Sequence, residues 1–259
     1  MIPERIRSKL ANGQPALGIS IRYPDPSPME LIAPAWDFIW IDLQHGTCSP
    51  AQVPDLVRVC DTTGTASLVR FPAQHDPNLA TWILDWDASG IVSAQVDNVE
   101  TARQLVQHVK FPPLGNRSFG GRRIIDRHGR DYVTRANREQ WLIVQIESPE
   151  GLDQCEAIAA IDGIDGLMIG PDDLRLRLFG SVAGPVYDTA MRPIHERITR
   201  AARAAGKLAM GFGGPAPETF QTAVSLGYQL ISVTADVLLL KERQQQILDT
   251  LKPVLPASR

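Results

Sequence analysis

The sequence predicts an α/β fold, a single (β/α)8 barrel of the TIM type that spans residues 1–259. Short apolar, β-branched runs alternate about eight times with segments of helical period, and Gly, Pro, Asp or Ser separates them. No composition break marks a linker, and 259 residues with 44% hydrophobic content are enough for one such domain. Eight βα units in series favour a closed parallel barrel over an open doubly wound sheet.

The expected elements follow from this alternation. The strands are the β-branched runs, at Ala16–Arg22, Phe38–His45, Ala66–Phe71, Gly90–Val96, Trp141–Glu147, Gly163–Gly170, Lys207–Phe212 and Gln229–Ala235. The helices are the periodic segments between them, near Pro28–Ala35, Ala51–Thr63, Pro77–Trp86, Val99–Val109, Pro149–Ile161, Thr189–Ala205, Pro217–Leu226 and Leu238–Leu251, where Pro253 ends the last one.

The strand Trp141–Glu147 supports the barrel by its parity. Leu142, Val144 and Ile146 alternate with Gln145 and Glu147, so the apolar side chains face the helices and the polar pair points inward. A polar inward face needs a partner, and in a barrel the carboxyl ends of all strands share one mouth.

Composition excludes several classes of function. A net charge of −3 and a pI near 6.0 provide no basic field for nucleic acid, and Lys and Arg form no long block. Three cysteines without CxxC spacing leave at least one unpaired, as in a reducing compartment. The charged first ten residues do not resemble a signal peptide, and no apolar run of about 18 residues occurs. We expect a cytoplasmic soluble protein that acts on small molecules.

One connection, Pro112 to Gln140, is unusually long. It carries Gly115-Asn-Arg-Ser-Phe-Gly-Gly-Arg-Arg123 and a short helix expected around Asp131–Glu139. Long insertions in compact domains are commonly lids or interface arms. The insertion lies near the mouth only if it folds back over the barrel.

Two carboxylates lie at the ends of consecutive strands. Glu147 and Asp173 are about one βα repeat apart, so the barrel brings their strand ends side by side. Two close anions are costly unless a cation neutralises them, and Mg²⁺ or Mn²⁺ suits two carboxylates. The residues alone leave this open against helix capping, by Glu147 near Ser148-Pro149 and by Asp172 and Asp173 at a helical turn.

Asp42 and His45 end the second strand. If the backbone leaves the regular pleat between them, Asp42 can accept a hydrogen bond from one imidazole nitrogen and leave the other as a base. The alternative is a histidine whose polar edge is satisfied at the barrel rim.

Arg70 ends an apolar strand, where its planar guanidinium suits a carboxylate or is exposed to water at the rim. Backbone N–H groups of Gly170 and Asp172 would reach the same anion. The segment Gly211–Gly214, which includes Phe212, lies where many barrels bind phosphate, but its glycines are weak support.

The remaining candidates are weaker. Arg117, Arg122 and Arg123 either bind anionic parts of a substrate or belong to a charged loop. Four histidines without ligand spacing are expected to be solvated: His75, His108, His128 and His195. Cys48 follows His45 closely, but nothing marks its thiol as activated.

In this order, the motifs resemble those of the HpcH/HpaI aldolase family of metal-dependent class II pyruvate aldolases, typified by 4-hydroxy-2-oxoheptanedioate aldolase. The likeness runs from Gly18 to about Leu240. Six collinear motifs carry it: Ile41-Asp-Leu-Gln-His-Gly46, Leu68-Val-Arg70, Leu84-Asp85, Phe111-Pro-Pro-Leu-Gly115, Val144-Gln-Ile-Glu147 and Ile169-Gly-Pro-Asp-Asp-Leu174.

The resemblance implies a role for each matching residue. Glu147 and Asp173 would bind a divalent cation (Mg²⁺, Mn²⁺ or Co²⁺), with Gln145 beside it. The pair His45 and Asp42 would be the base, acting through a metal-bound water.

The resemblance also implies substrate contacts and an assembly. Arg70 would clamp the 2-oxo acid, Gly170 and Asp172 would donate N–H groups to its carboxylate, and Phe212 would line the substrate site. Asp85 would reach into the site of a neighbouring subunit of a homohexamer, a trimer of dimers that exchange the helix Leu238–Leu251.

The expected reaction is reversible retro-aldol cleavage of a 4-hydroxy-2-oxo acid to pyruvate, or a related 2-oxo acid, and an aldehyde. Departures from the family pattern at Asp87, Ser93-Ala-Gln95, Ser118–Arg123 and Arg175–Phe179 leave the aldehyde open. Alternatives are a citrate-lyase-like enzyme acting on CoA thioesters, an oxaloacetate decarboxylase, and a non-catalytic barrel that binds keto acids.

Overall fold

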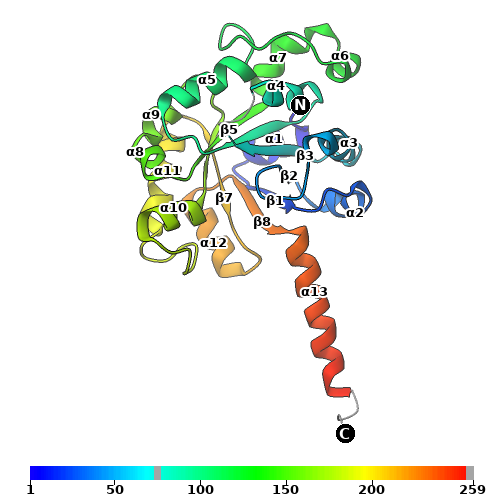
Figure 1. Ribbon diagram of the computed structural model, residues 1–259, viewed down its shortest axis with the longest axis vertical. Helices are drawn as coiled ribbons and strands as arrows, with labels where there is room; N and C mark the ends of the chain where they lie inside the picture. The colour runs from blue at the N-terminus through cyan, green and yellow to red at the C-terminus, as the bar shows by residue number, and fades with distance from the viewer. Residues whose placement is uncertain (73–76, 255–259) are drawn as a thin grey trace.

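The computed structural model describes residues 1–72 and 77–254, and it is a closed barrel of eight parallel strands in sequence order (Figure 1). The prediction of a single (β/α)8 architecture is confirmed. The strands are β1 (Ala16–Ile21), β2 (Phe38–Asp42), β3 (Ala66–Pro72), β4 (Gly90–Ala94), β5 (Trp141–Ile146), β6 (Gly166–Ile169), β7 (Leu208–Phe212) and β8 (Leu230–Ala235).

Helices alternate with the strands and surround them. They are α1 (Glu4–Ala11), α2 (Pro26–Ile32), α3 (Val53–Thr63), α4 (Pro77–Asp85), α5 (Val99–Val109), α6 (Arg122–His128), α7 (Val133–Glu139), α8 (Pro149–Asp153), α9 (Cys155–Ala159), α10 (Pro171–Phe179), α11 (Arg192–Ala204), α12 (Pro217–Leu226) and α13 (Asp236–Leu251). Four short 3₁₀ turns complete them, at Ala33–Ala35, Pro50–Gln52, Arg130–Tyr132 and Lys252–Val254.

Two hydrophobic clusters separate the inside of the barrel from the layer beneath the helices. On β5, Leu142, Val144 and Ile146 belong to the outer cluster, whereas Trp141 and Ile143 belong to the inner one. The alternation predicted for this strand is therefore confirmed, and Gln145 and Glu147 continue the inward face toward the mouth.

Helix α1 closes the end of the barrel at which the strands begin. Its Ile6, together with Ile2, packs in the inner cluster with Phe38 and Trp141, the first residues of β2 and β5. The inside of the barrel is therefore filled at this end, and the carboxyl ends of the strands form the mouth.

Several element boundaries differ from the predictions. Strand β2 ends at Asp42 rather than His45, because the Asp42 carboxylate accepts the next backbone N–H groups. Strand β6 begins at Gly166 instead of Gly163, and α10 is a full helix where a single turn was expected. Helix α1 was not anticipated.

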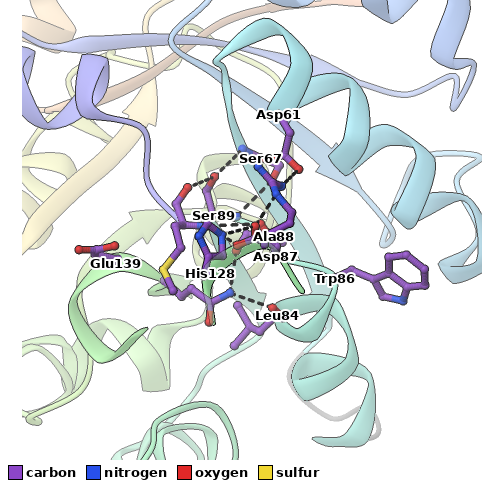
Figure 2. A network of polar contacts seen from close by, with 12 residues as sticks. Asp61, Ser67, Leu84, Trp86, Asp87, Ala88, Ser89, His128 and Glu139 are labelled. Carbon is purple, nitrogen blue, oxygen red and sulfur yellow. Dashed lines mark hydrogen bonds and ion pairs between the residues drawn. The ribbon is translucent and has the colours of Figure 1, made fainter. Parts of the chain in front are cut away.

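The insertion 112–140 packs against the strand beginnings, opposite the mouth. Asp87, which precedes β4, is 1% exposed and accepts from the Met1 amino group at 2.7 Å and from His128 Nε2 at 2.6 Å (Figure 2). Arg127 and Arg123 of α6 both form ion pairs with Asp61 of α3. Burial would raise the pKa of Asp87, but the charge and hydrogen bond of the Met1 amino group, followed by the interaction with His128, outweigh burial and lower the pKa. The insertion is thus an anchored cover of this end and not a lid.

Helix α13 projects away from the barrel (Figure 1), and several of its apolar side chains are exposed to solvent. Leu238, Leu240, Ile247, Leu248 and Leu251 are each 44–63% exposed. Among the described residues, no helix combines the length and apolar character needed to cross a bilayer. Apolar side chains exposed along a helix in this way suit contact with another copy of the chain.

Candidate active site

The Asp42 carboxylate joins three neighbouring strands at the barrel mouth. The β2–β3 register pairs Asp42 with Arg70, and the β1–β2 register, which pairs Ile21 with Ile41, brings Arg22 to the same level. Arg70 Nε and Nη2 donate to the two Asp42 oxygens at 2.9 and 2.7 Å, and Arg22 Nη1 donates to Oδ2. Both guanidinium groups lie over the Trp40 ring, at 4.6 Å for Arg70 and 5.9 Å for Arg22.

This cluster carries one more positive than negative charge. Burial of Asp42 would raise its pKa, but the hydrogen bonds and charges of Arg70 and then Arg22 outweigh burial and lower the pKa. Asp42 therefore stays ionised at neutral pH and cancels one of the two guanidinium charges. The remaining positive charge favours an anion next to these two arginines.

His45 was predicted to be the last residue of β2 but lies beyond the end of the strand, and among the described residues its imidazole is not hydrogen-bonded to Asp42. Asp42 Oδ1 instead accepts from the backbone N–H groups of Gln44 at 3.0 Å and His45 at 3.2 Å. The backbone does leave the pleat here, in a turn so tight that a Cβ on Gly46 would lie 2.3 Å from the Asp42 carbonyl oxygen. The expected contact is absent among the described residues because the arginines occupy both carboxylate oxygens, and the exposed His45 ring faces solvent.

Glu147 is buried at the end of β5 and held by two donors. Its Oε1 accepts from the Gln95 backbone N–H at 2.7 Å, and its Oε2 accepts from Gln145 Nε2 at 2.6 Å. Gln95 adopts φ +60°, unusual for a side chain other than glycine, to present that N–H. Burial, followed by repulsion from Asp173, raises the pKa of Glu147 to about 7. The two acids thus lie close enough to raise the pKa of Glu147, although the charges of Arg70 and Arg177 act in the opposite direction.

Gly170, between β6 and α10, leaves space beside Glu147. A Cβ at this position would lie 2.5 Å from Glu147 Cβ and 2.7 Å from Gln145 Nε2. Its backbone N–H already donates to Ile146 O at 2.9 Å, so the prediction that Gly170 donates to a substrate carboxylate is wrong: the parallel ladder uses that group. The amides of Asp172 and Asp173, in the first turn of α10, have no hydrogen-bond partner within the described ranges.

A cavity of about 280 Å³ opens beside these residues. Phe212, predicted to contact substrate, lines it and lies 5.7 Å from Trp40, centroid to centroid. Three buried polar atoms of lining residues have no hydrogen-bond partner in the described structure: Ser20 Oγ, Trp40 Nε1 and Thr234 Oγ1. Arg22 and Asp172 are the charged lining residues.

The loop after α10 forms one wall of this cavity through Val186. Arg175 holds the loop by donating to Pro185 O at 2.7 Å and to Asp188 at 2.8 Å. His195 is fully buried beneath it, bonded to Tyr228 Oη at 2.7 Å and Val186 O at 3.0 Å. Burial lowers the pKa of His195 to about 4, so it is a neutral structural histidine, and the expectation that it is solvated is wrong.

Asp85 lies apart from these residues, at the end of α4 beside the strand beginnings. Its Oδ1 accepts from Arg117 Nη2 at 2.7 Å. The structure therefore does not bring Asp85 into the site of its own chain, and a role at a neighbouring subunit stays a prediction. Arg117, Arg122 and Arg123 also belong to the insertion and form ion pairs there.

The other weak candidates divide as follows. Cys48, Cys60 and Cys155 are all buried and unpaired, and burial raises the pKa of the Cys48 thiol to about 12, which agrees with its dismissal as a nucleophile. His108 is exposed as expected, His75 lies outside the described residues, and the expectation that His128 is solvated is wrong, because its ring is bonded to the buried Asp87.

Two residues of this site, Arg22 and Gln95, were not predicted from the sequence. In the sequence, Arg22 follows an apolar run as Arg70 does, which was a usable signal, whereas nothing in the sequence marks Gln95 as a backbone donor.

Comparison with known proteins places this geometry in context. The model of the family described as HpcH/HpaI aldolase/citrate lyase matches residues 29–242. A 2-dehydro-3,6-dideoxy-6-sulfogluconate aldolase of Pseudomonas putida is 30% identical over 84% of each chain. A hydroxypyruvate/pyruvate aldolase of Deinococcus radiodurans is 35% identical over 77% of this chain and 74% of its own. The crystal structure of an HpcH/HpaI aldolase from Desulfitobacterium hafniense superposes with a TM-score of 0.86 at 27% identity, over 98% of each chain.

Proposed function

Because the chain belongs to the HpcH/HpaI aldolase/citrate lyase family, we propose that it cleaves 4-hydroxy-2-oxo acids to pyruvate, or a related 2-oxo acid, and an aldehyde. Membership and the identity to curated aldolases make it a carbon–carbon lyase. The observation that carries the proposed reaction is the pairing of buried Glu147 with half-buried Asp173 at the barrel mouth, where burial and then repulsion from Asp173 raise the pKa of Glu147 to about 7.

The residues present fit a divalent cation. Glu147 and Asp173 supply carboxylate oxygens, Gln145 Oε1 is a buried amide oxygen without a hydrogen-bond donor within the described ranges, and the missing side chain of Gly170 leaves room next to both. No cluster of three His, Cys, Asp or Glu side chains occurs in residues 1–72 and 77–254, so substrate and water oxygens would complete the shell. When bound, the cation would stabilise enolate charge as a Lewis acid; we propose Mg²⁺, Mn²⁺ or Co²⁺.

Substrate positioning falls to Arg70 and the first turn of α10. Arg70 uses Nε and Nη2 for Asp42, and its Nη1 has no hydrogen bond to the residues that the structure describes. We assign Nη1 to the C2 oxygen of the 2-oxo acid, where it adds a fixed positive charge as the enolate forms. The amides of Asp172 and Asp173 at the helix N-terminus suit the C1 carboxylate.

In cleavage, His45 accepts the C4 hydroxyl proton, the C3–C4 bond breaks, and its electron pair becomes the enolate of the 2-oxo acid while C4 becomes the aldehyde carbonyl. Protonation at C3 then yields pyruvate. Asp42 is a positioning residue, because it fixes Arg70 and orders the turn that carries His45.

The proposal extends to how copies of the chain assemble. We propose a cytoplasmic homohexamer in which dimers exchange α13 and Asp85 contributes to a neighbouring site. Exposed apolar side chains along α13, including Leu240 and Leu248, support an exchanged helix, and the unpaired cysteines suit a reducing compartment.

A metal-supplemented retro-aldol screen tests the function. Purified protein with Mn²⁺, Mg²⁺ or Co²⁺ is given 4-hydroxy-2-oxo acids of differing length and tail charge, and pyruvate release is followed. We expect turnover that chelation abolishes, and at least a hundredfold loss in His45→Ala, while His108→Ala, the same change at an exposed histidine of α5, retains full activity.

The screen also has outcomes that count against the proposal. Full activity after exhaustive chelation contradicts the metal mechanism. Turnover of CoA thioesters or of oxaloacetate alone would favour the alternative lyase or decarboxylase. Pyruvate binding without proton exchange at its methyl carbon in deuterated water would indicate a non-catalytic barrel.

A further inference from the structure

We propose that Arg22 forms a second anion subsite at the barrel mouth, which binds a carboxylate, sulfonate or phosphate group at the far end of the substrate. The subsite selects aldehydes with an anionic tail over neutral aldehydes of the same length. This inference rests on the function proposed above and adds a substrate class to it.

The backbone of Arg22 is fixed from two sides. Its N–H donates to Asp236 Oδ1 at 3.0 Å, and the next N–H, of Tyr23, donates to Asp236 Oδ2 at 3.0 Å. Its carbonyl oxygen accepts from the Thr47 backbone at 3.0 Å and from the Thr47 hydroxyl at 2.8 Å. Arg22 is thus held at the end of β1 by α13 on one side and the turn after β2 on the other, which preorganises its side chain for a ligand.

The guanidinium of Arg22 retains donors and charge. Asp42 already receives two hydrogen bonds from Arg70 and one from Arg22 Nη1, so it neutralises only one of the two arginines. Nε and Nη2 of Arg22 have no partner in the part of the chain that the structure describes. The Arg22 side chain is 30% exposed, against 6% for Arg70, so Arg22 is the guanidinium more accessible from the mouth.

The cavity next to Arg22 offers further unused donors. Ser20, Trp40 and Thr234 line it, and Ser20 Oγ, Trp40 Nε1 and Thr234 Oγ1 are buried without a hydrogen-bond partner in the described structure. Leaving buried polar groups unpaired is costly. After small rotations of these side chains, a substrate tail with several oxygen atoms can accept hydrogen bonds from them. A tail that ends in a methyl group cannot.

Two carboxylates besides Asp42 lie near the subsite. The buried one, Asp236, accepts hydrogen bonds from three backbone N–H groups, including that of Arg22. The other, Asp172, lines the cavity, but its side chain is exposed at the start of α10, where water screens its charge. Arg22 lies instead over the Trp40 ring, 5.9 Å from its centroid, with less water around it. Of the two charged side chains that line the cavity, the positive one is therefore less screened by water than the negative one.

The first test compares binding of two non-cleavable ligands, 2-oxoadipate and 2-oxohexanoate, which share length and 2-oxo acid group and differ only in the tail carboxylate. With Mn²⁺ present, calorimetry on the wild-type protein is expected to give about tenfold or greater preference for 2-oxoadipate. Arg22→Gln removes the preference and Arg22→Lys retains part of it. Arg192→Gln, which removes an exposed arginine of α11, leaves it unchanged. Equal wild-type affinities, or a preference that survives Arg22→Gln, overturn the proposal.

The second test distinguishes the tail chemistries. Aldol addition of pyruvate is measured with succinic semialdehyde, a sulfonated aldehyde and glyceraldehyde 3-phosphate, each against a neutral aldehyde of similar length. We expect at least one anionic partner to exceed its neutral control about tenfold in kcat/KM, and that ratio to collapse in Arg22→Gln. If pyruvate exchanges its methyl protons but no anionic aldehyde is preferred, the subsite is wrong and the aldolase stands. If no exchange occurs, the proposed function itself fails.

Discussion

Asp42→Asn is the most informative single change, because one buried carboxylate accepts from Arg70, Arg22 and two backbone amides. Asparagine has nearly the same shape as aspartate but carries no charge. Its NH₂ group is a donor, so it cannot accept the hydrogen bond that a guanidinium N–H donates to the carboxylate. Removing one partner of a buried ion pair costs about 3–5 kcal/mol. Arg22 is partly exposed and can turn to water, whereas Arg70 cannot. We therefore expect the free energy of unfolding to fall by about 3 kcal/mol, the low end of that range.

Urea unfolding measures this loss against a matched control. Asp126→Asn makes the same change at an acid that also pairs with an arginine, Arg122, but in a pair 85% and 49% exposed. Exposed pairs contribute about 0–1 kcal/mol, so the control should unfold almost as the wild type does. Equal losses in both variants would refute the argument that burial makes the Asp42 cluster important.

The pH dependence of this difference has a definite sign. The folded-state pKa of Asp42 lies below its unfolded value of 3.8, so its contribution is fully present above that value and is lost as the pH falls through the folded pKa. The difference between wild type and Asp42→Asn should therefore be constant above about pH 5 and shrink below about pH 4. A difference that grows on acidification contradicts the ionised carboxylate.

Three further predictions follow from the site and the core. Gly170→Ala should abolish Mn²⁺ binding by calorimetry and cost about 1–3 kcal/mol by overpacking, whereas Gly120→Ala, where a Cβ meets nothing closer than 3.6 Å, should do neither. Because the pKa of Glu147 is raised to about 7, Mn²⁺ must displace a proton at lower pH, so its affinity should fall by about tenfold per pH unit below 7 and level off above it; a flat profile in calorimetry contradicts this. The buried thiols of Cys48, Cys60 and Cys155 should resist iodoacetamide at pH 7.5 and all react in 6 M guanidinium, as mass spectrometry would reveal; rapid labelling of the folded protein argues against their burial.

The sequence predicted the barrel well because strand parity and the alternation of elements are local signals. The inward orientation of Gln145 and Glu147 was predicted correctly, because the apolar residues that alternate with them along β5 define its outward face. The end of β2 was placed too late, because the carboxylate of Asp42 captures amides that a strand would otherwise use.

Contacts between strands were harder to predict. The Asp42–Arg22 pair and the use of the Gly170 amide both depend on register across neighbouring strands, which one sequence does not specify. The position of the insertion could not be predicted either, because Asp61 and Asp87, which hold α6 in place, are distant from it in the sequence.

The closure of the barrel floor by Ile2 and Ile6 has a kinetic consequence. With one end sealed, reactants share a single route through the mouth. In the proposed arrangement the 2-oxo acid lies near Glu147, and the aldehyde lies between it and the solvent, near Arg22, which is more accessible from the mouth than Arg70. Synthesis must then begin with the keto acid, and cleavage must release the aldehyde first, so the steady-state mechanism is compulsory-ordered.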